Sequence, residues 1–206
     1  MQGLDSCKKI GILGGTFNPI HIGHLLMAET AVEMLDLDKV IVMPSGISYL
    51  KANTNVLPGL LRLDMVQMSI QNNPHLIASD MEIKREGNTY TYETLEILKK
   101  QYPQASFYFI VGADCLFSIE RWVEPQKIFD NCILVAAGRN NASDVSMLAA
   151  KKNLEEKFCA HIILMDFPQI EISSTAVREN VRCGKSIRYM VTEEVRQYIY
   201  ENQLYK

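Results

Sequence analysis

A glycine-rich loop between a short apolar run and a segment of helical periodicity is the feature that most constrains the fold. The apolar run is Lys8 to Leu13, and the glycine-rich loop runs from Gly14 to His24. The next segment, Ile22 to Leu35, carries apolar residues at helical spacing, and Lys39 to Met43 is a second β-rich run. Strand, loop, helix and strand in this order predict a βαβ unit, which requires parallel strands and a right-handed crossover.

The alternation of strands and helices continues along the rest of the chain. Further strands are expected over His75–Ser79, Phe107–Val111, Cys132–Ala137 and His161–Met165. Further helices are expected over Gly59–Gln71, Thr91–Gln101, Val145–Lys157, Ser173–Arg182 and Thr192–Tyr200. This order predicts a single doubly wound α/β domain over residues 1–206, with a Rossmann-like parallel sheet and helices on both faces. Residues 1–7 are expected to form a loose N-terminal extension, and residues 173–206 a C-terminal helical part.

Composition and charge limit the classes of function. The formal net charge of −3 argues against a nucleic-acid polymer as partner, so an anionic ligand must be held locally. Glycines, a proline and histidines interrupt the longest charge-free run, Ile10 to Ala28, and no apolar signal segment precedes it, which predicts a cytoplasmic protein without a membrane span. The five cysteines form no C-x-x-C pair, which argues against a disulfide framework and a thiolate metal site.

The glycine-rich loop has the composition of a phosphate-binding loop. Its glycines let the backbone approach a phosphate closely, and the helix that follows offers unpaired N–H groups and a positive dipole end. His21 and His24 lie three residues apart at the helix start, so both rings can donate hydrogen bonds to one phosphate. A tight turn with two surface histidines is one alternative. A metal pair is another, but it would need further ligands, and His75 and His161 are not in ligand spacing with this pair.

Two distant segments together resemble the nucleotidyltransferase superfamily. Residues Gly14 to His24 resemble the signature G-G-S/T-F-x-P-x-H-x-G-H, and Ile172 to Arg178 resemble the motif I-S-S-T-x-I/V-R. The resemblance extends from Lys8 to about Tyr205, and it implies an ATP site that residues 173–206 complete. The residues expected at ATP are Gly14, Gly15, Thr16, Phe17, Gly23, His24, Gly112, Asp114, Ser173, Ser174, Thr175 and Arg178.

The second motif has its own physical rationale. Ser173, Ser174 and Thr175 open a helix, so their hydroxyls and N–H groups can bind the β- and γ-phosphates, while Arg178 adds positive charge one turn later. The alternative is an ordinary N-cap followed by a solvated arginine. The glycine-rich loop from Gly14 to His24 has the composition of a phosphate-binding loop, and its presence in the same chain favours phosphate binding over an ordinary N-cap for this second motif.

Residues between the motifs point to the acceptor of the transferred group. Tyr90 to Leu95 resemble the Y-T-x-x-T-L segment of nicotinate mononucleotide adenylyltransferases, and by that likeness Thr91 and Trp122 contact the nicotinate. Trp122 offers a flat apolar face for stacking, although a core or surface tryptophan is the alternative. Gly112-Ala113-Asp114 resembles the superfamily's G-x-D, in which the aspartate lies at the nucleotide; Asp114 could instead cap a helix. Thr16 and Tyr90 complete the expected acceptor contacts.

The loop between Pro44 and Pro58 departs from the family pattern. The family has Pro-Pro-His-Lys where this chain has Ser48-Tyr49-Leu50-Lys51, so Lys51 remains a candidate phosphate ligand while Leu50 replaces the histidine. This replacement leaves the choice of acceptor open. Arg62 and Arg139 are weaker candidates, because arginines on helices and loops are usually solvated.

The resemblance implies transfer of AMP from ATP to nicotinate mononucleotide, with His21, His24 and Arg178 as catalytic residues. Mg²⁺ is expected to bind mainly through ATP, so no metal-ligand motif is expected in the sequence. Alternatives are another phosphate acceptor such as phosphopantetheine, CTP with a sugar-alcohol phosphate, or a non-catalytic nucleotide sensor. A class I tRNA synthetase is set aside, because no K-M-S-K-S stretch is present. The sequence leaves open the preference for nicotinate over nicotinamide and the formation of a homo-oligomer.

Overall fold

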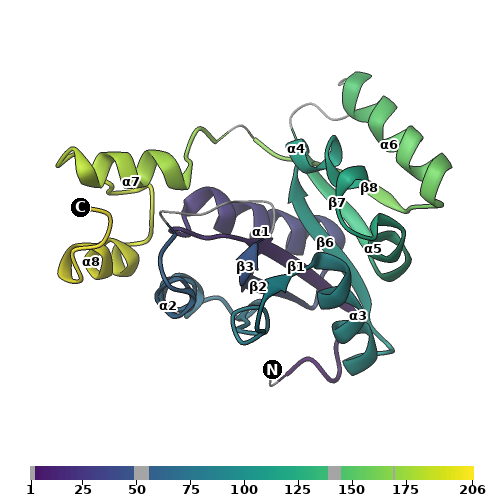
Figure 1. Cartoon of the computed structure of the whole chain (residues 1–206), viewed down its shortest axis with the longest axis horizontal. Coiled ribbons are helices and arrows are strands. Elements are labelled where there is room, and N and C mark those ends of the chain that lie inside the picture. The colour runs from purple at the N-terminus through teal and green to yellow at the C-terminus, as the bar shows by residue number, and fades with distance from the viewer. Residues whose placement is uncertain (1–2, 49–55, 139–144, 169) are drawn as a thin grey trace.

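Six parallel strands form the central sheet, in the order β4-β2-β1-β6-β7-β8 (Figure 1). A computed structural model describes residues 3–48, 56–138, 145–168 and 170–206. The strands of the sheet are β1 (Lys9–Gly15), β2 (Lys39–Pro44), β4 (Leu76–Ala78), β6 (Ser106–Gly112), β7 (Ile133–Gly138) and β8 (Ile162–Asp166). Two short strands, β3 (Ile47–Ser48) and β5 (Asn88–Thr89), pair with each other in parallel outside this sheet.

Helices cover both faces of the sheet because the central strands are apolar on both sides. Alternate residues of β1 point to opposite faces: Ile10 and Ile12 join one buried cluster, and Leu13 joins the other. The Leu13 cluster includes side chains of α1 (Ile22–Leu35), α2 (Gly59–Ile70), α7 (Ser174–Arg182) and α8 (Glu193–Glu201). The other cluster includes side chains of α3 (Thr91–Gln101), α4 (Ala113–Leu116), α5 (Pro125–Asn131) and α6 (Val145–Phe158). The predicted doubly wound α/β fold is confirmed.

The strand order reverses between β1 and β6. From β1 the chain moves to β2 and β4 on one side, and later it returns to β6, β7 and β8 on the other. Connections from β1 and β6 therefore leave the sheet in opposite directions, which opens a crevice at their carboxyl ends. Both the first loop, Thr16–His21, and helix α4 begin there.

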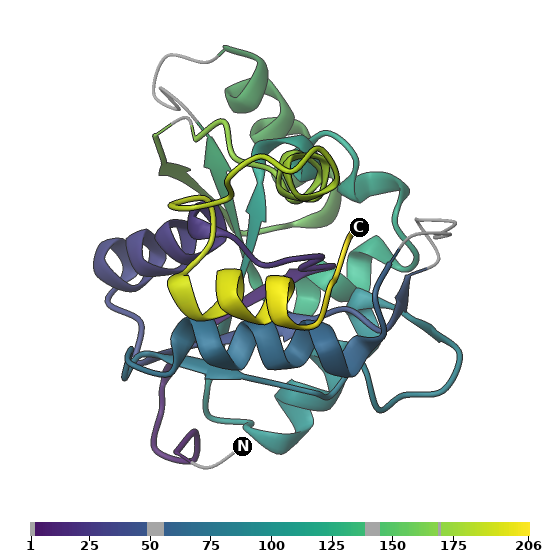
Figure 2. The ribbon, with the colours of Figure 1, turned by 90° about the vertical axis from the view of Figure 1, so that its left-hand side faces the viewer.

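The last two helices return to the start of the fold. Figure 2 shows α8 lying alongside α2, and the Tyr198 hydroxyl of α8 donates a hydrogen bond to the Asp64 carboxylate of α2 at 2.9 Å. Helix α7 packs Val177 and Val181 into the same cluster as α1. Residues 173–206 are thus joined to the βαβ unit through apolar packing.

Some expectations from the sequence are wrong in detail. The expected loose extension over residues 1–7 is wrong for Leu4 and Cys7, which are buried in the cluster that contains Ile10. Strand β1 also continues through Gly14 and Gly15, because these residues pair with the end of β2. The short helices α4 and α5 and the 3-10 turn Ile119–Arg121 carry too few residues to show helical periodicity.

Candidate active site

Phe17 gives the first loop its shape. Its backbone adopts a left-handed conformation with φ of 46°, and its side chain is buried. A Cβ atom on Gly15 would lie 2.8 Å from the Phe17 ring, so only glycine at this position allows the ring to fold back. Gly14 is less constrained, since a Cβ there would meet only the Phe109 ring at 3.7 Å.

His21 and His24 lie face to face at the start of α1. Their ring centroids are 3.6 Å apart at an interplanar angle of 25°, and the rings of Phe17 and His24 form a T-shaped pair with centroids 4.9 Å apart. The backbone N–H of His21 donates to Nδ1 of His24 at 3.2 Å, so the proton of the neutral His24 ring is on Nε2. A Cβ on Gly23 would lie 3.1 Å from Nδ1 of His21, which explains the glycine between the histidines.

Both histidines are held in the neutral form. Burial lowers the pKa of His21 to about 4, and burial together with the neighbouring His21 lowers the pKa of His24 well below its usual range. Within the described residues, Nδ1 of His21 is buried and has no hydrogen-bond partner. The rings can therefore act as hydrogen-bond donors to a phosphate at neutral pH without bringing a full positive charge.

The two motifs contact each other directly. The Ser174 hydroxyl donates to the carbonyl of Pro19 at 2.7 Å across 155 residues of sequence. The Arg178 guanidinium donates to the carbonyl of Asn18 at 2.9 Å across 160 residues. The expectation that these two segments fold together is confirmed, and they meet at the loop that follows β1.

The hydroxyls of the second motif are already engaged within the protein. Ser173 caps α7 by accepting the Ala176 N–H at 3.1 Å, so the N-cap interpretation is correct for this residue. Thr175 accepts a hydrogen bond from Arg178 at 3.1 Å. Because Ser173 and Thr175 are the acceptors in these bonds, their O–H groups can still donate to an anion, together with the N–H groups at the start of α7 and the remaining donors of the Arg178 guanidinium.

Asn18 connects the first loop to the end of the chain. Its side chain is buried, and its Oδ1 accepts hydrogen bonds from the Leu57 N–H at 3.2 Å and the Tyr205 hydroxyl at 3.0 Å. Burial raises the pKa of Tyr205, which keeps the hydroxyl protonated as the donor. The sequence analysis did not identify either residue, and no local pattern singles out Tyr205.

Arg62 is a buried structural residue, so the expectation of a solvated arginine is wrong. Its guanidinium donates to the carbonyls of Thr16 at 2.7 Å, Ser45 at 2.8 Å and Leu57 at 3.0 Å. Only 4% of Arg62 is exposed, and burial lowers its pKa. These bonds hold three loops around one side chain. Lys51 and Arg139, the other basic candidates, lie outside the described residues.

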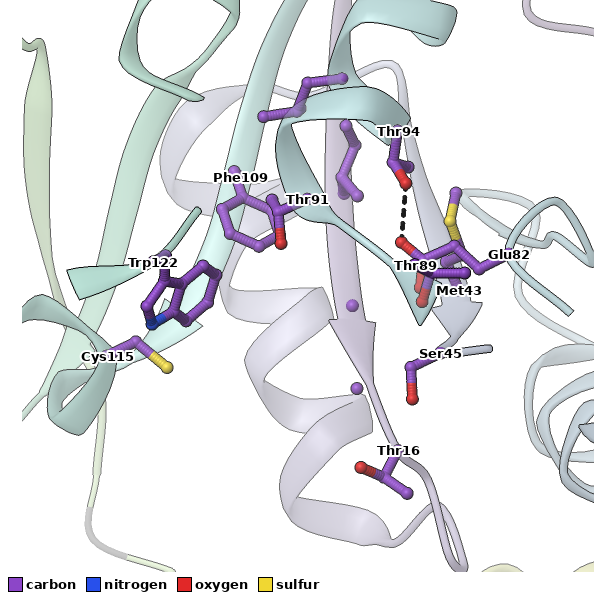
Figure 3. A pocket seen from close by; sticks show the side chains of 14 residues that line it. Thr16, Met43, Ser45, Glu82, Thr89, Thr91, Thr94, Phe109, Cys115 and Trp122 are labelled. Atoms are coloured by element: carbon purple, nitrogen blue, oxygen red, sulfur yellow. Dashed lines mark hydrogen bonds between the residues drawn. The ribbon is translucent and has the colours of Figure 1, made fainter. Parts of the chain in front are cut away.

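A cavity of about 300 Å³ begins at the first loop and extends along the sheet (Figure 3). Thr16, Thr91 and Trp122, three of the expected acceptor contacts, line it together with Gly14 and Gly15. The Trp122 ring lies edge-on to Phe109 with centroids 6.3 Å apart. The fourth expected contact in the described chain, Tyr90, stacks on Tyr92 and is not a lining residue.

Glu82 gives this cavity an acidic side that the sequence analysis did not identify. Figure 3 shows Trp122 on one side of the cavity and Glu82 with Thr94 on the other. The Thr94 hydroxyl donates to Glu82 at 2.8 Å and accepts from Arg85 at 3.2 Å. Arg85 in turn forms an ion pair with Glu93 at 3.3 Å, so the acidic side is fixed by a polar network.

Gly112 and Asp114 lie at the carboxyl end of β6. This strand pairs with β1, the strand that precedes the first loop. Gly112 occupies the N-cap position of α4, and Asp114 is exposed in its first turn, so the alternative role of Asp114 as the cap is wrong. A Cβ on Gly112 would meet nothing within 4 Å, which leaves room for a ligand.

In the described part of the chain, no group of three or more His, Cys, Asp and Glu side chains could hold a metal ion. None of the described helices is long and apolar enough to cross a membrane.

Comparisons with known proteins agree with this geometry. The family model described as cytidylyltransferase-like matches residues 12–180. A protein of Lachnoclostridium phytofermentans named "probable nicotinate-nucleotide adenylyltransferase" is 44% identical over 198 residues, covering 96% of this chain and 99% of its own. A protein of the same name from Clostridium beijerinckii is 43% identical, covering 97% of this chain and all of its own.

A solved structure supports the fold. The nicotinic acid mononucleotide adenylyltransferase of Plasmodium falciparum complexed with NaAD superimposes with a TM-score of 0.77 at 23% identity, covering 96% of this chain and 97% of that one. The chain therefore belongs to the cytidylyltransferase-like family of nucleotidyltransferases and, within it, to the nicotinate-nucleotide adenylyltransferases.

Proposed function

We propose that this chain transfers AMP from ATP to nicotinate mononucleotide, which yields nicotinate adenine dinucleotide and pyrophosphate in NAD biosynthesis. The observation that carries the proposal is the pair of hydrogen bonds from Ser174 and Arg178 to the first loop, beside the cavity of Thr91 and Trp122. These contacts support a triphosphate site beside a pocket for a flat ring. The names of the full-length relatives agree with it.

The reaction is an in-line displacement at the α-phosphorus. A bond forms between an oxygen of the acceptor phosphate and the α-phosphorus, and the bond from that phosphorus to the β-phosphate oxygen breaks. The acceptor phosphate is already anionic, so the protein needs only to orient the two substrates and stabilise charge. In this scheme His21 and His24 donate hydrogen bonds to the α-phosphate, and Arg178 with the start of α7 holds the departing pyrophosphate.

The acceptor ring fits the cavity between Trp122 and Thr91. Trp122 offers a face for stacking, and Phe109, which also lines the cavity, makes a T-shaped contact with the indole. The Thr91 and Thr16 side chains offer polar contacts at the rim, in the positions that the resemblance implies. Within the described chain these are the proposed acceptor contacts, and Tyr90 is the N-cap residue of the helix that Thr91 begins.

A magnesium ion fits the site only as part of the nucleotide. The two motifs contain no carboxylate, and they offer N–H and O–H donors, two imidazoles and a guanidinium, whereas Mg²⁺ prefers oxygen ligands. ATP oxygens and waters would therefore hold Mg²⁺, as is usual for this ion, and it would neutralise charge on the triphosphate. The cytoplasmic location and the absence of a nucleic-acid partner stay predictions.

A panel of acceptors tests the proposal. The full chain is incubated with ATP, MgCl₂ and one acceptor at a time: nicotinate mononucleotide, nicotinamide mononucleotide, phosphopantetheine or glycerol 3-phosphate, and dinucleotide and pyrophosphate are quantified. We expect the highest kcat/KM with nicotinate mononucleotide. Equal turnover with every acceptor, or turnover only with a non-pyridine acceptor, would show that the proposed substrate is wrong.

A further inference from the structure

The cavity at the first loop has a negative charge in its lining, although the proposed acceptor is an anion. Among the described residues that line it, Glu82 alone is charged; the others are glycines, apolar side chains, hydroxyls and one thiol. The phosphate and the nicotinate carboxylate of the acceptor are both repelled by this carboxylate. Glu82 therefore weakens acceptor binding unless it lies close to a group of positive charge.

No cationic side chain of the described chain lies within ion-pair distance of Glu82. Its Oε1 atom accepts a hydrogen bond from the Thr94 hydroxyl at 2.8 Å, and Arg85 donates to the same hydroxyl. The charge of Arg85 is matched by Glu93 at 3.3 Å. Arg62 attracts Glu82 from farther away, but its guanidinium donates to three carbonyls. Among these residues, the network fixes the carboxylate and leaves its charge and its Oε2 atom for a ligand.

Two aromatic rings lie across the cavity from Glu82. Figure 3 shows Trp122 and Phe109 on one side and Glu82 on the other. The two rings meet at 73° with centroids 6.3 Å apart, so their faces are steeply inclined to each other. Aromatic faces attract organic cations, and a carboxylate adds a full opposite charge. The lining therefore has the chemistry of a site for a flat organic cation.

We propose that the cavity recognises the positive charge of the acceptor's pyridinium ring, with Glu82 as a specificity-determining residue opposite Trp122. The proposal rests on the proposed function for the identity of the acceptor. In a pyridine mononucleotide the ring nitrogen carries the ribose, so the ring is a cation at every pH. This ring is the only positively charged group of the acceptor. The cavity would thereby select a pyridinium nucleotide over one with an uncharged ring of the same size.

The apolar part of the lining strengthens this selection. Ile12, Met43 and Leu95 line the cavity together with the aromatic rings. Opposite charges attract each other more strongly beside such side chains than in bulk water, because the effective dielectric constant is lower. The repulsion between Glu82 and the two anionic groups of the acceptor favours a pose in which both groups point away from the carboxylate.

Calorimetric titration with a pair of matched ligands tests the proposal. The ligands are nicotinate mononucleotide and the benzoate C-ribotide, in which a carbon atom replaces the ring nitrogen and leaves the ring neutral. We expect the wild-type chain to bind nicotinate mononucleotide about tenfold more tightly than the neutral analogue. Glu82→Gln keeps an acceptor for the Thr94 hydroxyl, and it should weaken nicotinate mononucleotide about five- to tenfold while changing the analogue less than about twofold.

Glu96→Gln is the matched control, because it removes an exposed carboxylate of α3 that does not line the cavity. It should bind both ligands as the wild type does. Thermal unfolding verifies that the variants are folded. Glu82→Ala, which removes the charge without leaving an amide in the cavity, replaces Glu82→Gln if that variant does not fold.

The ligand pair gives clear outcomes against the proposal. Equal wild-type affinity for both ligands would overturn it, because the ring charge would then contribute nothing. An equal loss of both ligands in Glu82→Gln would also overturn it, since the ribose, carboxylate and phosphate are common to the two. Unchanged or tighter binding of nicotinate mononucleotide in Glu82→Gln, or the same loss in Glu96→Gln, would overturn the role of Glu82.

Steady-state kinetics separates this proposal from the proposed function. If the chain makes dinucleotide, Glu82→Gln should raise the KM for nicotinate mononucleotide and leave the KM for ATP unchanged. Dinucleotide formation with equal efficiency from the neutral analogue would leave the proposed function standing and contradict the recognition of charge. If no acceptor gives dinucleotide, the proposed function fails, and the calorimetric comparison still decides whether the cavity recognises a pyridinium ring.

Discussion

The imidazole rings of His21 and His24 stack 3.6 Å apart, and the backbone N–H of His21 fixes the proton of His24 on Nε2. The stack buries both rings against the first loop and disfavours their protonation. The two histidines that the sequence presents as hydrogen-bond donors to a phosphate are therefore neutral before a ligand binds.

This neutral state should make stability depend on pH. The folded-state pKa of His21, about 4, is below its unfolded value of about 6.5, so the unfolded chain binds the proton more readily. Stability from this residue is complete above pH 6.5 and is lost as the pH falls toward 4. Between pH 7 and pH 5, urea denaturation should show a loss of about 1–2 kcal/mol from His21. In His21→Gln, the loss in the free energy of unfolding between pH 7 and pH 5 should be smaller by that amount. An identical loss in the variant and the wild type would contradict the lowered pKa of His21.

His24→Ala should separate turnover from binding. The hydrogen bond from Nε2 is expected to strengthen as charge grows on the α-phosphate, so its removal should lower kcat by about a hundredfold or more. The dissociation constant of ATP should change much less. His161→Ala, which removes an exposed histidine at the start of β8, is the control and should retain wild-type kinetics. A His24→Ala enzyme with near-normal kcat would remove His24 from the transition state.

Arg62→Lys should destabilise the chain despite the retained charge. A lysine ammonium cannot reach three carbonyls in the geometry of the guanidinium, so at least one buried carbonyl loses its partner. We expect a loss of about 2–4 kcal/mol in the free energy of unfolding, measured by urea denaturation. The exposed Arg121→Lys should differ from wild type by less than about 0.5 kcal/mol. Equal stabilities of the two variants would show that the three bonds contribute little.

Trp122→Ala should weaken acceptor binding alone. Loss of the stacking face should raise the KM for nicotinate mononucleotide about tenfold and leave the KM for ATP within about twofold of wild type. The Trp122→Phe variant keeps a smaller ring against Phe109, so its KM for nicotinate mononucleotide should lie between those of the wild type and Trp122→Ala. A rise in the KM for ATP with no change for the acceptor would move Trp122 out of the acceptor site.

The periodicity of the chain was enough to predict most of the fold. The β-type runs and the amphipathic segments are local patterns, and a parallel α/β arrangement follows from their order, as β1, α1 and β2 illustrate. The short helices α4 and α5 were not predicted, because four to seven residues are too few to show helical periodicity. The burial of Leu4 and Cys7 was not predicted, because the residues that cover them are distant in the sequence.

The sequence by itself determined the chemistry of the two motifs, since the glycines and histidines of the first motif and the hydroxyls and arginine of the second motif each lie within a dozen residues. Only the tertiary structure decided how they are held: Arg62 donates to the carbonyls of Thr16, Ser45 and Leu57, and Tyr205 donates to Asn18 across 187 residues. The same holds for the protonation of His21 and His24, because burial sets their pKa. Contacts and burial depend on which distant segments meet in the folded chain, and a local pattern carries no information about them.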